Sequence, residues 1–150
     1  MSIRRRTLII AAPAAGLLAP AAFAATPQIY AENGIVVDGS DVVAYFDQQG
    51  PVAGDPSITY EYLGATWHFA NSANRDLFAA NPVAYAPQYG GYCAFAISRG
   101  YTAPTDPRAW SIVDDKLYLN YSRRIRRRWE QDIPGNIAAG DANWPAVLDA

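Results

Sequence analysis

Two pairs of β-branched and aromatic runs constrain the fold of this chain most strongly. The first pair covers residues 58–63 and 65–69, on either side of Gly64. The second pair covers residues 110–113 and 116–120, separated by a polar Asp-Asp dipeptide. Short runs of this composition around a turn are typical of β-hairpins. The sequence therefore predicts two hairpins.

Each predicted hairpin is followed by a helix with a capping residue. Asn71 or Ser72 caps a helix that extends to about Ala80, because short polar side chains accept hydrogen bonds from the first free backbone amides. The inner face of this helix is predicted from its apolar residues, which are Ala73, Leu77 and Phe78. Pro82 then opens a short turn that runs to Tyr85.

The C-terminal part is predicted to be helical. Ser122 caps a helix that runs to Asp132 and that we expect Pro134-Gly135 to end. A last helix is expected over 136–148, interrupted at Gly140 and Pro145. Residues 39–46 form either a short helix or one strand, with the helix favoured, and the apolar run 92–98 fits a helix or a strand equally well. The predicted fold class is α+β, a small single domain with two short β-hairpins and several short packed helices.

The N-terminus has the pattern of an export signal. Residues 4–6 are arginines, residues 8–18 form an apolar run, and Ala22-Phe23-Ala24 is a small-x-small cleavage signature. The pair Arg5-Arg6, followed by Thr7-Leu8-Ile9, fits a twin-arginine signal, and an ordinary secretory signal is the alternative. We predict that residues 1–24 are a signal peptide and that residues 25–150 are periplasmic or otherwise exported.

Charge and cysteine content limit the partners and the means of stabilisation. Loss of residues 1–24 leaves nine basic and fourteen acidic residues, a net charge of −5, which disfavours nucleic acid as a partner. The single cysteine cannot form an internal disulfide, so packing must hold the fold. The apolar run of the signal is too short for a comfortable membrane span, and we expect no integral membrane protein after cleavage.

Residues 67–85, WHFANSANRDLFAANPVAY, resemble the core of the YHS domain. The residues that carry the pattern are Phe69, Arg75, Phe78, Pro82 and Tyr85. The likeness continues into what resembles a longer, exported branch of that family, through residues 41–46, 89–94, 115–120 and 143–145. The resemblance implies that residues 25–150 are a YHS-like domain with a C-terminal helical extension.

The resemblance also implies metal handling, since YHS modules accompany heavy-metal and copper transport proteins. The metal-binding form carries two cysteines at the junction between strand and helix, and those positions are Ala70 and Asn74 in this chain. Neither residue supplies the thiolate or imidazole that soft cations need. The departure puts metal binding at the usual site in doubt.

Cys93 and His68 are the remaining candidate metal ligands. Cys93 follows Gly90-Gly91, a pair that allows a close backbone approach, but its apolar neighbours favour a small buried hydrophobic residue. His68 alternates with Trp67 and Phe69, so it is predicted on the exposed face of a strand if those aromatics are buried. The alternative brings Cys93 and His68 together as a two-ligand copper(I) or zinc site.

The arginines within 123–128 are interpreted as a solvated helix face. Two i, i+4 pairs, Arg126 with Glu130 and Arg128 with Asp132, are expected to neutralise part of their charge. Docking of an acidic partner or a membrane surface is the alternative for this run.

Three functional hypotheses follow. The leading one is an exported YHS-domain binding module, not an enzyme, with a copper-related role and copper as its only candidate cofactor. The alternative is a YHS domain that has lost its metal and serves as a structural or protein-interaction module with a periplasmic protein partner. The third is a thiol-dependent enzyme that uses Cys93, for which the sequence shows no catalytic constellation.

Overall fold

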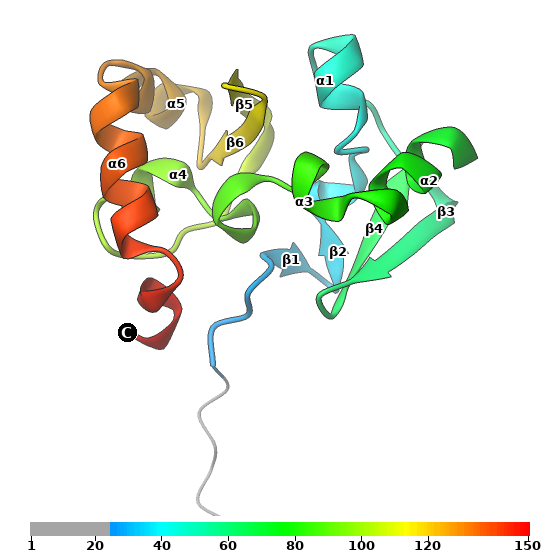
Figure 1. The fold of residues 1–150 in the computed structure, drawn as a ribbon, viewed down its shortest axis with the longest axis horizontal. Helices are drawn as coiled ribbons and strands as arrows, with labels where there is room; N and C mark the ends of the chain where they lie inside the picture. The colour runs from blue at the N-terminus through cyan, green and yellow to red at the C-terminus, as the bar shows by residue number, and fades with distance from the viewer. Residues whose placement is uncertain (1–24) are drawn as a thin grey trace, which may run out of the picture.

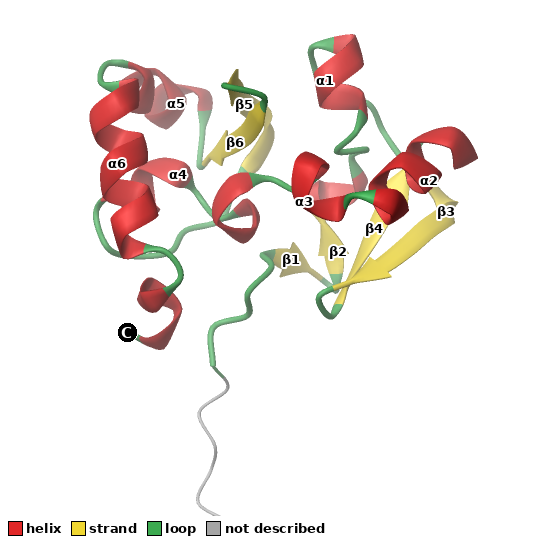
Figure 2. Ribbon diagram, in the orientation of Figure 1, coloured by secondary structure: helices red, strands yellow, loops and turns green. Residues whose placement is uncertain are grey.

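Two small β-sheets and the helices around them make up residues 25–150, the part of the chain that the computed structural model describes (Figures 1 and 2). The signal peptide predicted at residues 1–24 lies outside the described residues. The predicted α+β class and both predicted hairpins are confirmed.

The first sheet has four strands in the order β1-β2-β4-β3. Its strands are β1 (Ala31–Glu32), β2 (Ile35–Val36), β3 (Asp55–Tyr62) and β4 (Ala65–Phe69). β3 and β4 form the first hairpin, and β2 pairs with β4 in parallel through Ile35 and Thr66. Strands β1 and β2 were not predicted, because two-residue strands are too short to show a period.

The second sheet is the hairpin of β5 (Asp106–Val113) and β6 (Lys116–Asn120). Its turn residues, Asp114 and Asp115, have φ angles of 50° and 59°. A two-residue loop with two positive φ angles is the type I′ turn that joins twisted antiparallel strands.

Short helices cover the sheets. The α-helices are α1 (Ala44–Gln48), α2 (Ser72–Ala80), α3 (Pro82–Tyr85), α4 (Ala94–Ser98), α5 (Arg123–Glu130) and α6 (Ile133–Asn143). The 3-10 helices are η1 (Val37–Gly39), η2 (Gln88–Gly91) and η3 (Ala146–Asp149). None of the described helices combines the length and the apolar character needed to cross a membrane.

The predicted helix caps are present. The Asn71 side chain accepts the amide of Asn74 at 2.8 Å and begins α2, and Ser122 accepts the amide of Ile125 at 3.1 Å and begins α5. For the run 92–98, where the sequence fits a helix or a strand, the structure shows a helix, α4, over Ala94–Ser98. Both caps satisfy amides that a helix start leaves free.

The expected break between two C-terminal helices is present, but it lies at residues 131–132, and Pro134-Gly135 belong to the first turn of the second helix, α6. The Asp132 side chain accepts the amide of Gly135 at 3.1 Å, and proline fits the first turn of a helix, where its missing N–H costs nothing. Gly140 does not interrupt α6 either. A Cβ at Gly140 would overlap the Tyr89 hydroxyl, so glycine permits this close packing.

The core consists of two apolar clusters on either side of the β5–β6 hairpin. Phe78 and β6 residues Leu117 and Leu119 belong to the first cluster, beside the four-stranded sheet. Tyr118 and Trp129 belong to the second, beside α4, α5 and α6. Because strand side chains alternate between faces, β6 contributes to both clusters and joins them.

The inner face of α2 differs from the prediction. Phe78 is fully buried, whereas Leu77 is 48% exposed and Ala73 is also exposed. The residues that fix the inward face are Asn74 and Phe78, four positions apart, since Asn74 bonds to the buried Asp41.

Candidate functional site

Asp41 lies fully buried between η1 and α1 and accepts four hydrogen bonds. Its Oδ1 accepts the backbone amides of Val43 at 2.9 Å and Ala44 at 3.2 Å. Its Oδ2 accepts the backbone amide of Ala70 and the side-chain amide of Asn74, both at 2.8 Å. These five residues are called the Asp41 node below. The node ties the start of α1 to the junction between β4 and α2.

The Asp41 node occupies the place where the resemblance to YHS domains puts two cysteine ligands. Ala70 and Asn74 each supply an N–H donor there, and the acceptor positions of the carboxylate are taken by the four donors. A soft cation needs thiolate or imidazole ligands. The residues at this position therefore do not fit a soft metal ion.

Cys93 is buried, with 2% of its surface exposed, just before α4. Its sulfur accepts the Tyr121 amide at 3.3 Å and lies 3.5 Å from the Asn120 side-chain oxygen, to which the thiol can donate. Burial raises the pKa of Cys93, although nearby backbone N–H groups oppose the shift. The thiol is therefore neutral at physiological pH, and it borders a hollow of about 300 Å³ with Phe95 and Arg128.

His68 is also buried, contrary to the prediction that it lies on an exposed strand face. Only 9% of its surface is exposed. The segments around Gly39 and Gly54 cover it, and their backbones are joined by the Gly54 amide, which donates to the Gly39 carbonyl at 2.8 Å. A Cβ on Gly54 would come within 2.6 Å of the His68 Cβ, so glycine is what allows this covering layer.

The structure does not bring Cys93 and His68 together. His68 borders a different hollow, of about 410 Å³, whose other lining residues include Glu32 and Asp38. Within residues 25–150 no group of three or more His, Cys, Asp or Glu side chains is placed to hold a metal ion. The two predicted ligands thus lie in separate environments.

The Cys93 thiol should react slowly. We expect alkylation by iodoacetamide at pH 7.5 to be at least about tenfold slower in the folded chain than in urea, because burial hides the sulfur and disfavours thiolate. Mass spectrometry of timed samples measures both rates. Equal rates in the folded and the unfolded chain would contradict this prediction and restore the thiol-enzyme hypothesis.

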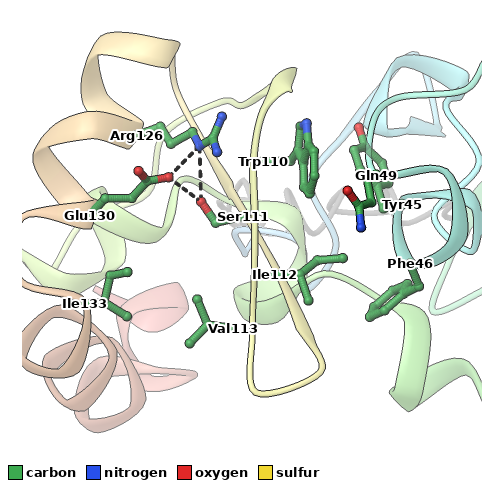
Figure 3. A pocket seen from close by; sticks show the side chains of 10 residues that line it. All are labelled: Tyr45, Phe46, Gln49, Trp110, Ser111, Ile112, Val113, Arg126, Glu130 and Ile133. Atoms are coloured by element: carbon green, nitrogen blue, oxygen red, sulfur yellow. Dashed lines mark hydrogen bonds and ion pairs between the residues drawn. The ribbon is translucent and has the colours of Figure 1, made fainter.

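A third hollow, of about 400 Å³, lies beside β5, between α1 on one side and α5 and α6 on the other (Figure 3). It is called the β5 groove below, and its lining residues are Tyr45, Phe46, Gln49, Trp110, Ser111, Ile112, Val113, Arg126, Glu130 and Ile133. One wall comes from α1 and Gln49, the residue that follows it, and the opposite wall comes from α5 and the start of α6. Its volume falls in the range of ligand-binding clefts.

The α1 wall of the β5 groove is mainly aromatic. The Tyr45 ring lies 5.9 Å from the Trp110 ring, and its hydroxyl donates to the Pro107 carbonyl at 2.7 Å. Burial raises the pKa of Tyr45, so the hydroxyl stays protonated and keeps this bond. Phe46 is held edge-on to Tyr85, with ring centres 5.6 Å apart. Contacts with Trp110 and Pro107 thus hold Tyr45 in place, and the contact with Tyr85 holds Phe46.

The α5 wall carries an ordered charged network. The Arg126 Nε donates to Glu130 at 2.6 Å and lies 3.2 Å from the Ser111 hydroxyl, which donates to the same Glu130 oxygen at 2.9 Å. The predicted pair of Arg126 and Glu130 is confirmed. Arg128 instead lies over the Phe95 ring, 5.4 Å from its centre, and forms no ion pair with Asp132 among the described residues.

No residue of the β5 groove was predicted from the sequence as a site. Arg126 and Glu130 were expected only as a solvated pair, since nothing in the sequence places α5 opposite α1. The groove depends on tertiary packing of segments that are about 60 to 80 residues apart in the chain. The arginine-rich run 123–128 was the one sequence feature that pointed to this part of the surface.

Comparison of the chain with protein-family models, with curated proteins and with solved structures gives no significant match.

Proposed function

We propose that residues 25–150 form an exported, non-enzymatic module that binds another protein, built on a YHS-like fold whose metal position has become structural. The single observation that carries the proposal is the Asp41 node. Both positions that would hold cysteine ligands, Ala70 and Asn74, donate to one buried carboxylate. The export signature at residues 1–24 supports a periplasmic location.

The two competing hypotheses have less support from the geometry. A shared copper site would need Cys93 and His68 in one cavity, and they border different hollows. A thiol enzyme would need an accessible thiolate, whereas Cys93 is buried and its pKa is raised. The binding-module hypothesis requires neither condition.

Copper(I) competition tests the proposal. We expect residues 25–150, under anaerobic conditions, to leave copper(I) with a chromophoric chelator, because no thiolate pair is available. The Cys93→Ser and His68→Ala variants should behave in the same way. Replacing both family positions (Ala70→Cys with Asn74→Cys) gives a matched variant that should withdraw copper(I) from the chelator. Stoichiometric withdrawal by the unaltered chain, lost in Cys93→Ser, would overturn the proposal in favour of a copper site.

A further inference from the structure

The β5 groove runs along the outer edge of strand β5. Its lining includes four consecutive strand residues, 110–113, and no residue of β6. Because successive side chains of a strand point to opposite faces, a hollow bordered by all four lies along the strand edge and not over one face. Figure 3 shows this arrangement, with Trp110 and Ile112 on the side of α1 and Ser111 and Val113 on the side of α5 and α6.

The hairpin geometry determines which backbone groups face the groove. In a two-residue type I′ hairpin, the residues that flank the turn form a hydrogen-bonded pair, here Val113 and Lys116. Hydrogen-bonded and non-bonded pairs alternate, so Ser111 also bonds to β6 while Trp110 and Ile112 direct their N–H and C=O groups outward. No hydrogen bond within residues 25–150 is recorded for these outward groups.

The two walls differ in charge and therefore define what can lie between them. The α1 wall offers Tyr45 and Phe46 beside Trp110 and Ile112. On the α5 wall, Arg126 uses its Nε for Glu130 and Ser111, and no recorded hydrogen bond or ion pair within residues 25–150 involves its two terminal nitrogens. Helix α5 has five arginines and one glutamate, although residues 25–150 have a net charge of −5. Only Arg126 and Glu130 of this helix line the groove, so the positive charge there is that of the Arg126 guanidinium, which also lies 5.6 Å from the centre of the Trp110 ring.

We propose that the β5 groove binds an extended peptide segment of a partner protein, which adds a strand to the outer edge of β5. The peptide backbone pairs with Trp110 and Ile112. Alternate side chains then point to opposite walls, apolar ones toward Trp110 and Phe46 and an acidic one toward the terminal nitrogens of Arg126. This is strand addition, in which backbone bonds supply affinity and side-chain pockets supply specificity. The inference rests on the proposed function and specifies its partner.

An exposed strand edge needs protection against unwanted pairing, and β5 has it. The walls from α1 and α5 enclose the edge, so a wide sheet cannot approach it. A single extended segment can enter between the walls. A small amphipathic carboxylate could use Arg126 and the aromatic wall but would leave the outward backbone groups of Trp110 and Ile112 without partners. The backbone groups therefore favour a peptide.

The probe is a synthetic peptide, acetyl-Ser-Val-Glu-Val-Glu-Val-Ser-amide, titrated into ¹⁵N-labelled residues 25–150 while amide NMR spectra are recorded. The amides of Trp110 and Ile112 should shift, with saturation giving the Kd. Two N-methylated versions test backbone pairing, one methylated on the valines and one on the glutamates. Only one edge of the added strand faces β5, so one version should bind at least about tenfold more weakly while the other retains its affinity.

Charge is tested by two further comparisons. A peptide with lysine in place of both glutamates should bind at least about tenfold more weakly. Arg126→Gln should weaken binding of the glutamate peptide by a similar factor, whereas Arg124→Gln, on the exposed side of the same helix, should change it by less than about twofold.

Phenylbutyrate, a small amphipathic carboxylate, is titrated in the same way for comparison. Three results would overturn the inference: no shift at Trp110 and Ile112 at millimolar peptide, equal affinity of both N-methylated versions, or phenylbutyrate binding as tightly as the peptide. The last result would assign the groove to small carboxylates. None of these depends on copper. Failure of strand addition is therefore distinguishable from failure of the proposed function, which the copper(I) competition decides.

Discussion

Asp41→Asn is expected to lower the free energy of unfolding by about 3–6 kcal/mol. The substitution keeps one acceptor oxygen for the amides of Val43 and Ala44. Its new NH₂ group, however, faces the donors of Ala70 and Asn74, which lose a charged acceptor in a buried position. Hydrogen bonds to charged groups are worth about 1.5–3 kcal/mol each, and two are lost. Urea unfolding followed by tryptophan fluorescence measures the change.

Asp47→Asn is the matched control, because Asp47 is an exposed residue of the adjacent helix α1. It should change the free energy of unfolding by less than about 0.5 kcal/mol. Similar small effects for both variants would show that Asp41 does not hold α1 to the β4–α2 junction. The interpretation of Ala70 and Asn74 as structural donors to Asp41 would then also be wrong.

Phe78→Ala is expected to destabilise the fold by about 3–5 kcal/mol. Phe78 is fully buried and lies against four aromatic rings, those of Tyr60, Tyr62, Trp67 and Phe69, with centre distances of 5.9, 5.6, 4.7 and 5.2 Å. Truncation leaves a cavity that rigid aromatic neighbours cannot fill. Urea unfolding measures this loss as well.

The neighbouring residue supplies the control for Phe78. Leu77→Ala removes a comparable apolar side chain from the same helix, but Leu77 is 48% exposed, so the loss should stay below about 1 kcal/mol. A larger loss for Leu77→Ala than for Phe78→Ala would mean that α2 packs mainly through Leu77, contrary to the burial of the two residues. The assignment of Asn74 to the inner face would then be wrong.

Local sequence signals predicted the elements that are determined locally. The hairpins at 58–69 and 110–120 were recognisable because paired apolar runs flank turn residues, and the caps Asn71 and Ser122 act within one helical turn. Pro134 was misjudged because proline can start a helix as readily as it ends one, and the cap from Asp132 decided which. Whether a proline starts or ends a helix therefore depends on the residue that caps the backbone amides next to it.

Contacts between distant segments were beyond local prediction. In the Asp41 node, Asp41 bonds to Ala70 and Asn74, which lie 29 and 33 positions further along the chain, and only packing brings them together. The burial of His68 depends on the segments around Gly39 and Gly54 that fold over β4. The β5 groove likewise arises where α1 and α5 meet one strand edge. Each of these features needs tertiary structure.

Amide hydrogen exchange at residues 110–113 tests most directly whether binding uses the open edge of β5. In the free chain we predict fast exchange at Trp110 and Ile112 and slow exchange at Ser111 and Val113, because only the latter two donate to β6. Addition of the glutamate peptide should slow exchange at Trp110 and Ile112 and leave the other two unchanged. Equal protection of all four amides in the free chain, or no change at Trp110 and Ile112 with saturating peptide, would contradict the account.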